Sequence, residues 1–176
     1  MKEVITLTER ELQHAHAIAH GRNAPKQAAG VVDQRFDPNR TSFGVQLAGY
    51  LGELAVAKAL GISTDTSLHL SGDNGTDLSY RGYSLQVKTR IRRANGDLIF
   101  PVAKPLKADV AVLVIQQSES EYLIAGIIGR SRFYRISKPL FMYNGECLAV
   151  GQKDLLPLQV LRIAKGRTVE NALEET

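Results

Sequence analysis

The segment GTDLSYRGYSLQVKTR, residues 75–90, constrains the fold more than any other part of the chain. Its dipeptide Arg81 and Gly82 is typical of a tight turn between two strands, because glycine supplies the positive φ that hairpin turns need. If these two residues form the turn, Asp77 on the first strand faces Gln86 on the second. Directly opposed residues lie on the same face of a sheet, about 5 Å apart at Cβ.

Lys88 is the diagonal neighbour of Asp77 in this pairing. A four-residue loop centred on the same dipeptide keeps both residues on one face, whereas a loop of odd length would place them on opposite faces. The hairpin therefore predicts a cluster of one carboxylate, one amide and one ammonium group, which is the geometry of a site.

Composition limits the class of protein. At 176 residues with 44% hydrophobic content, the chain is expected to form a single domain with a substantial core. It has no apolar run of the ~20 residues that a membrane span requires, and its first residues, MKEVITLTEREL, lack the apolar region of a signal peptide. One cysteine, Cys147, fits a reducing cytoplasm and predicts a structural thiol. The net charge of +4 permits nucleic-acid binding without demonstrating it.

Two helices are expected before the hairpin. Thr8 and Glu11 form a possible capping box for a helix that Gly21 would end. Residues 22–42 have no sustained period and are expected to form a long basic connection. A second helix is expected over residues 43–60, capped by Ser42 and stopped by Gly61.

Short apolar runs predict strands after the hairpin, with residues 110–116 and 122–128 forming a second antiparallel hairpin. A strand over 98–102, a short helix over RSRFYRI and further short strands within 147–163 are also expected. This order predicts an α/β or α+β fold with a mixed central sheet flanked by helices. The predicted organisation is one domain overall, with an N-terminal helix and basic connection (1–42), a core (43–164) and a polar tail (165–176).

Glu53 is the one acid within the second predicted helix, and its i−4, i+3, i+4 and i+7 neighbours are all small or apolar. If this stripe packs on the sheet, the carboxylate needs a partner, because burying a charge without one is very costly. A cation in the core would supply it. A glutamate at the helix edge and a pair with Lys58 are the alternatives, and the pair is weak because i+5 is not a facing position.

GYLGELAVAKALG, then GTDL, a turn and LQVKTR together resemble the PD-(D/E)XK nuclease superfamily. The resemblance spans about residues 43–128 and is strongest to relatives with a QxK strand, such as Mrr-type restriction enzymes and Holliday-junction-resolvase-like or phage nucleases. It implies a restriction-endonuclease-like αβββαβ core around a divalent metal. Carried over by position, the catalytic residues are Glu53, Asp77, Gln86 and Lys88.

The resemblance implies hydrolysis of DNA phosphodiester bonds, by an endonuclease or a structure-selective nuclease. Mg²⁺, for which Mn²⁺ can substitute, prefers carboxylate and carbonyl oxygens and neutralises charge on the phosphate. Asp77 would be the central ligand, with Glu53 and the backbone carbonyl of Val87 as further ligands. Lys88 would hold or deprotonate the attacking water, or stabilise charge on the phosphorane.

Gln86 departs from the commoner acid at this position, since an amide offers one neutral oxygen and no charge. The site would then contain two protein carboxylates and bind free metal more weakly. Two alternatives follow: an inactive nuclease-fold protein that grips nucleic acid without cutting it, and a structural salt bridge of Glu53 or Asp77 with Lys88. Cutting both strands with one small site would imply a homodimer.

Beyond Lys88, the basic residues Arg90 and Arg92 continue along one face of the strand, because alternate residues share a face. Such a row suits contact with a phosphate backbone, where each contact adds affinity but no sequence information. Arg93 and Lys104 are expected to extend it. The predicted partner is double-stranded or branched DNA, with no membrane partner; the alternative is an ordinary solvated sheet face.

Overall fold

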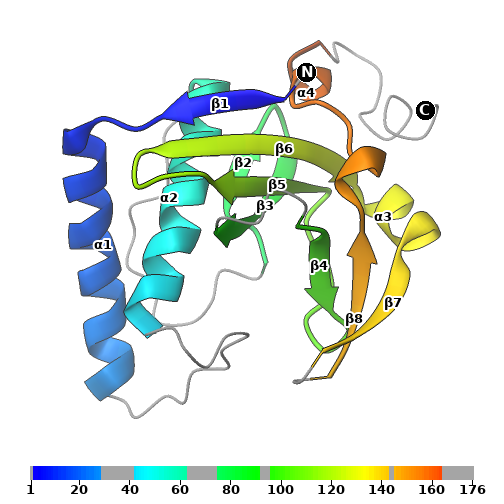
Figure 1. Cartoon of the computed structure of the whole chain (residues 1–176), viewed down its shortest axis with the longest axis horizontal. Helices are drawn as coiled ribbons and strands as arrows, with labels where there is room; N and C mark the ends of the chain where they lie inside the picture. The colour runs from blue at the N-terminus through cyan, green and yellow to red at the C-terminus, as the bar shows by residue number, and fades with distance from the viewer. Residues whose placement is uncertain (1, 29–41, 63–74, 92–95, 143–144, 164–176) are drawn as a thin grey trace.

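The fold is of the α+β class, as the sequence predicted, and combines four α-helices and two sheets within the described residues (Figure 1). The structure, a computed structural model, describes residues 2–28, 42–62, 75–91, 96–142 and 145–163. The elements in chain order are β1 (Glu3–Thr6), α1 (Glu9–Ala28), α2 (Ser42–Leu60), β2 (Leu78–Tyr80), β3 (Tyr83–Ile91), β4 (Leu98–Pro101), β5 (Val110–Gln116), β6 (Glu121–Gly129), α3 (Arg130–Ile136), β7 (Lys138–Met142), β8 (Gly145–Val150), the 3₁₀ turn η1 (Gln152–Asp154) and α4 (Gln159–Ile163).

The larger sheet has five strands in the order β1-β6-β5-β3-β2. Strands β3 and β5 are parallel, and the other neighbours are antiparallel, so the sheet is mixed as expected. A second sheet has the order β4-β8-β7 and is antiparallel throughout. Among the described helices, none combines the length and hydropathy that a membrane span requires.

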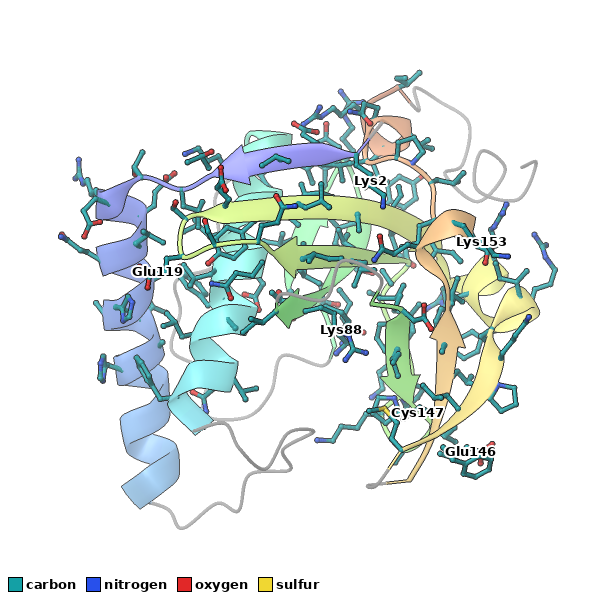
Figure 2. The ribbon with its side chains drawn as sticks, in the orientation of Figure 1. Lys2, Lys88, Glu119, Glu146, Cys147 and Lys153 are labelled. Carbon is teal, nitrogen blue, oxygen red and sulfur yellow. The ribbon has the colours of Figure 1, made fainter. Side chains whose placement is uncertain are left out.

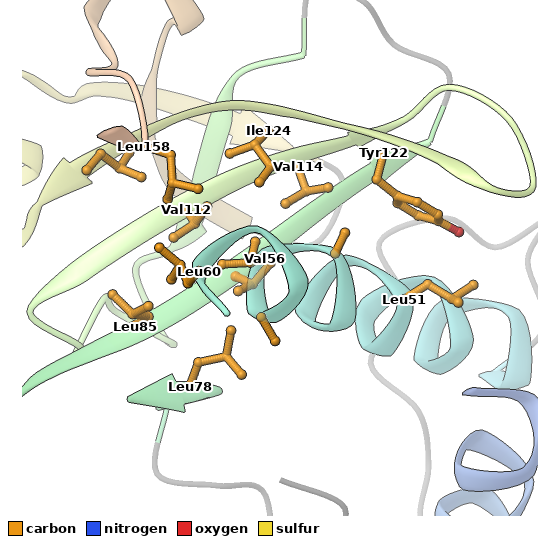
Figure 3. Close-up of a cluster of buried hydrophobic side chains, with 14 of the residues drawn as sticks. Leu51, Val56, Leu60, Leu78, Leu85, Val112, Val114, Tyr122, Ile124 and Leu158 are labelled. Carbon is orange, nitrogen blue, oxygen red and sulfur yellow. The ribbon is translucent and has the colours of Figure 1, made fainter. Parts of the chain in front are cut away.

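Strand β5 is buried on both faces, which explains why its sequence is apolar throughout. Val112 and Val114 point into a core shared with α2, where Val56 and Leu60 pack (Figure 3). Leu113 points the opposite way, into a core with the second sheet and α3. The expectation of a sheet flanked by helices is therefore correct for one face, while a second sheet covers most of the other.

The opening hairpin has the predicted register. Leu78 pairs with Leu85 and Tyr80 with Tyr83. Arg81 and Gly82 have φ values of 49° and 87°, as a type I′ turn requires at both central positions. The pairing ends at Leu78, and the preceding residue, Asp77, donates its backbone N–H to Leu85 O, so Asp77 lies beside β3 outside the regular register.

The capping box at the start of α1 is confirmed. The Thr8 backbone N–H and hydroxyl both donate to Glu11 Oε2, at 2.6 and 2.8 Å, and the Glu11 N–H donates back to the Thr8 hydroxyl at 3.3 Å. The predicted end at Gly21 is wrong, since α1 continues to Ala28. A glycine inside a helix costs only about 1 kcal/mol relative to alanine, so a single glycine is a weak stop signal.

Helix α2 ends as predicted at Gly61, whose φ is 68°. The Gly61 N–H donates to Lys58 O and the Ile62 N–H to Ala57 O, the two bonds of a Schellman motif. The side chain of Lys58 donates to Glu11 Oε2 at 2.8 Å and to Thr6 O at 2.9 Å. These bonds tie α2 to the start of α1, and they engage the lysine that was the alternative partner of Glu53.

The element order departs from αβββαβ after its first four members. From α2 the chain follows α, β, β, β through β4, but the next element is β5 rather than a helix. In addition, β4 does not belong to the large sheet; it pairs with β8 in the second sheet. The nuclease-like order is thus reproduced only up to β4.

Two strands were not predicted. Strand β1 pairs with β6 along residues 3–6, so the first residues of the chain belong to the main sheet. Strand β7 pairs with β8 at the edge of the second sheet. The further strands expected within 147–163 are limited to part of β8 and one bridge at Leu156, because the chain then forms η1 and α4. The connection expected over residues 22–42 is wrong for residues 22–28, which belong to α1; residues 29–41 and the tail at 165–176 lie outside the described residues.

Candidate functional site

Asp77 directly precedes β2, at the end of the hairpin away from the turn. Its backbone N–H donates to Leu85 O at 2.8 Å, which continues the hairpin by one residue. Its carboxylate turns back to β3, and Oδ2 accepts a hydrogen bond of 2.6 Å from the Val87 N–H. The Asp77 carboxylate thus accepts the hydrogen bond of a β3 backbone N–H that lies beyond the last residue paired with β2.

Val87 presents its backbone to the same edge. Within a strand, the N–H and C=O of one residue point to the same side, so the Val87 carbonyl also faces the β2 edge near Asp77. The Val87 side chain is buried in the core beneath α2. Its carbonyl oxygen is therefore in the place expected of a ligand supplied by the backbone.

Gln86 contributes an oxygen with unusual surroundings. Its Oε1 is buried and has no hydrogen-bond partner among the described residues. The amide nitrogen lies near Gly75: a Cβ added at Gly75 would lie 3.7 Å from Gln86 Nε2 and 3.6 Å from Lys107 Cβ. A buried acceptor without a donor is unfavourable unless another group satisfies it. A cation or a water would do so.

Lys88 projects from the face of β3 opposite to α2. Its backbone neighbour on β5 is Leu113, which faces the second sheet. The Nζ of Lys88 lies 4.9 Å from the centre of the Phe100 ring on β4. Figure 2 shows Lys88 on the side of β3 that faces β4. Its ammonium group is thus at the margin of the core between the two sheets.

Gly52, the residue before Glu53, brings α2 into contact with β3. A Cβ at Gly52 would collide with Thr89 Oγ1 and would lie 3.1 Å from Thr89 Cβ, so α2 and β3 are in direct contact there. In contrast, a Cβ at Gly49 would meet nothing within 4 Å.

The four expected catalytic residues therefore surround one stretch of β3, residues 86–89. Asp77 binds this stretch directly, Gln86 and Lys88 belong to it, and Glu53 is adjacent to the helix residue that contacts it. The pairing of β2 with β3 ends at Leu78, so the face that Asp77 shares with Lys88 stays a prediction. Lys88 lies on the face of β3 opposite to α2, the helix that carries Glu53, so a site shared by all four residues stays a prediction as well.

The basic row is only partly described. Arg90 is half-buried and lies opposite Ile115 of β5, on the same face as Lys88. The row therefore runs beside the core between the sheets and is not the open, solvated face of the alternative interpretation. Lys104 is exposed in the turn after β4. Arg92 and Arg93 lie outside the described residues.

A second carboxylate, which the sequence did not single out, anchors the parallel pair of strands. Asp109 Oδ2 accepts bonds from the Ser84 N–H at 3.0 Å and from the Ser84 hydroxyl at 2.7 Å. The hydrogen bond from the Ser84 N–H has the largest effect on the pKa of Asp109 and lowers it, while partial burial acts in the opposite direction. With the Ser84 hydroxyl and the Arg130 guanidinium, this hydrogen bond lowers the pKa of Asp109 below its ordinary value. Asp109 fixes the start of β5 against β3.

Within the described ranges, no three histidine, cysteine or acidic residues gather in a way that could hold a metal ion. The expected ligands include only two carboxylates, from Glu53 and Asp77, and the remaining oxygens are neutral. Two contacts of the site were missed from the sequence. Gly52 carried a signal, since glycine inside a helix often marks a close approach, whereas nothing in the sequence placed Phe100 under Lys88.

Comparison with known proteins finds a family match over residues 2–95, from the start of β1 to just beyond the end of β3. This range includes all four expected catalytic residues and stops before β4. No curated protein and no solved structure matches the chain. Because the match covers 94 of the 176 residues (2 to 95 inclusive), the chain belongs to the family of unknown function DUF5843.

Proposed function

We propose that this protein is a Mg²⁺-dependent nuclease of the PD-(D/E)XK type that hydrolyses phosphodiester bonds in DNA. The observation that carries the proposal is the hydrogen bond from the Val87 N–H to the Asp77 carboxylate. It fixes an acid at the strand edge beside Gln86 and Lys88, as the D and QxK pattern requires. The contact of Gly52 with Thr89, which brings the helix that carries Glu53 against β3, supports the proposal.

The donor set fits a hard cation. Asp77 and Glu53 would supply charged oxygens, and the Val87 carbonyl and Gln86 Oε1 neutral ones, which suits Mg²⁺. The buried Gln86 oxygen has no hydrogen-bond partner among the described residues and would gain one from the ion or its water. When bound, the ion supplies positive charge that stabilises the phosphate as negative charge builds on it. Lys88 would orient the attacking water or bind a phosphate oxygen.

Cleavage assays test the proposal. The full chain is incubated with supercoiled, linear and branched DNA, and with RNA, in Mg²⁺, Mn²⁺ or EDTA. We expect metal-dependent cutting of at least one DNA substrate, and a loss of about 100-fold or more in Lys88→Ala with little change in melting temperature. Lys153→Ala, which removes an exposed lysine far along the chain, is the matched control and should retain full activity. Equal cutting by Lys88→Ala would identify a contaminating nuclease and refute the proposal.

A second candidate function is nucleic-acid binding without cutting. The amide of Gln86 favours it, because the third carboxylate common in this superfamily is missing from the strand. Binding in EDTA, without cleavage in any metal, would support this function over hydrolysis. In either case Arg90→Ala should lower the salt slope of DNA binding by about one phosphate contact, whereas Arg135→Ala on α3 should not. Equal slopes in both variants would remove Arg90 from the interface.

A further inference from the structure

The ring beneath Lys88 is held rigidly. Phe100 is 1% exposed and packs edge-on against Phe133, with ring centres 5.2 Å apart and planes at 75°. Phe133 in turn packs edge-on against Tyr134, at 5.4 Å and 82°. Both phenylalanines belong to the core between the two sheets. The ring face that meets Lys88 is thus fixed by neighbours on β4 and α3.

A rigid ring face is a specific support for an ammonium group. The face of an aromatic ring carries partial negative charge, and a cation within about 6 Å of the ring centre is attracted to it. The distance of 4.9 Å from Lys88 Nζ is inside this range. A lysine side chain otherwise has a flexible four-carbon stem and samples many rotamers. The ring therefore restricts where the ammonium group can lie.

We infer that Phe100 is a positioning residue that holds the Lys88 ammonium group in place for the reaction at Asp77. This inference rests on the proposed function. It also gives β4 a role in the site. Strand β4 belongs to the second sheet, and its residue Phe100 lies against the Lys88 side chain of β3. The second sheet would then be part of the catalytic arrangement, although the family match ends before it begins.

Nuclear magnetic resonance can detect the contact without any cleavage. Aromatic ring currents shift the resonances of nuclei above a ring face. The ε-methylene resonance of Lys88 should therefore be displaced from the ε-methylene resonances of the eight other lysines. In protein labelled at the lysine ε-carbon, Lys88→Arg identifies the resonance by its disappearance. Phe100→Leu should return it to the common position, whereas Tyr122→Leu, which removes a buried ring from the other core, should not. An unchanged resonance in folded Phe100→Leu would overturn the inference.

Kinetics then test the consequence. Tyr122→Leu is the matched control, because it removes a buried ring from the other core and leaves both the ring beneath Lys88 and the Phe133 ring that supports it. We expect Phe100→Leu to lower kcat roughly 10-fold with a smaller change in KM, since misplacing a group by about 1 Å can cost up to about 100-fold in rate. Tyr122→Leu should lower stability but not kcat.

If Phe100→Leu does not fold, Phe100→Met fills the space with a flexible side chain and makes the same test. Equal kcat values in the two leucine variants would refute the positioning role. If the unaltered protein cuts no substrate with any metal, the nuclease proposal fails, and the resonance of Lys88 still reports whether the ring holds it. The two failures are therefore distinguishable.

Discussion

Replacing Gly52 by alanine tests how closely α2 approaches β3, on which the location of Glu53 depends. The added Cβ would collide with Thr89 Oγ1 and would also lie 3.1 and 3.3 Å from the Thr89 Cβ and Cγ2. Threonine is β-branched and stiff at χ1, so rotation of its side chain gives limited relief. The substitution therefore forces either the helix or the strand to move.

The magnitude follows from two opposing effects. Alanine in place of glycine stabilises a helix interior by about 0.5–1 kcal/mol. Overpacking a filled site typically costs about 1–3 kcal/mol. Gly52→Ala should therefore range from nearly neutral to about 2 kcal/mol destabilising. Gly49→Ala, one turn earlier in the same helix, meets nothing within 4 Å and should stabilise by the helix effect alone.

The difference between the two variants isolates the steric cost, expected to be about 1–3 kcal/mol. Urea denaturation followed by far-ultraviolet circular dichroism measures it, since the chain contains no tryptophan. Thr89→Ala should be mild, because the buried Oγ1 has no hydrogen-bond partner among the described residues to lose. In the Thr89→Ala background, Gly52→Ala should stabilise as Gly49→Ala does. Equal effects of the two glycine substitutions in the original background would refute the close contact.

Three further predictions concern stability. Because the pKa of Asp109 is lowered, its contribution to the free energy of unfolding is present above the ordinary pKa of 3.8 and is lost as pH falls through the lowered value. Asp109→Asn should remove this part of the decrease of the urea midpoint with falling pH. An unchanged pH dependence of the midpoint would contradict the prediction. Burial, followed by the charge of Glu119, raises the pKa of Tyr122 to about 12. The contribution of this phenol to the free energy of unfolding is therefore full below pH 10 and is lost as pH rises through about 12. Tyr122→Phe should remove the last phenol to ionise in an absorbance titration. Thr8→Ala should cost about 1 kcal/mol of unfolding free energy through loss of the α1 cap, and an unchanged urea midpoint would show that the cap contributes nothing.

The hairpin and its register were predictable because the information is local. Two turn residues and the alternation of the flanking strands fix which residues of β2 and β3 oppose each other. That Asp77 and Lys88 share a face stays a prediction. The capping box at Thr8 and the end of α2 at Gly61 are local for the same reason. Metal binding and catalysis by these residues stay predictions.

The surroundings of Lys88 were not predictable, because they depend on strands distant in sequence. Strand β4 pairs with β8, about 50 residues later, and only this pairing brings Phe100 beneath the lysine. A short apolar run such as residues 98–102 indicates a strand but not the sheet to which it belongs. Helix α1 passed its predicted end because one glycine is a weak stop signal.

Strand β1 has a practical consequence for how the protein can be divided. Residues 3–6 form the outer strand of the large sheet and shield the backbone of β6. A truncated protein beginning at residue 43 would expose the amides and carbonyls of a long, apolar strand to other molecules. Such a bare edge recruits further strands and promotes aggregation. Insolubility of that fragment would therefore report a lost border strand and say nothing against the chemistry assigned to the remaining residues.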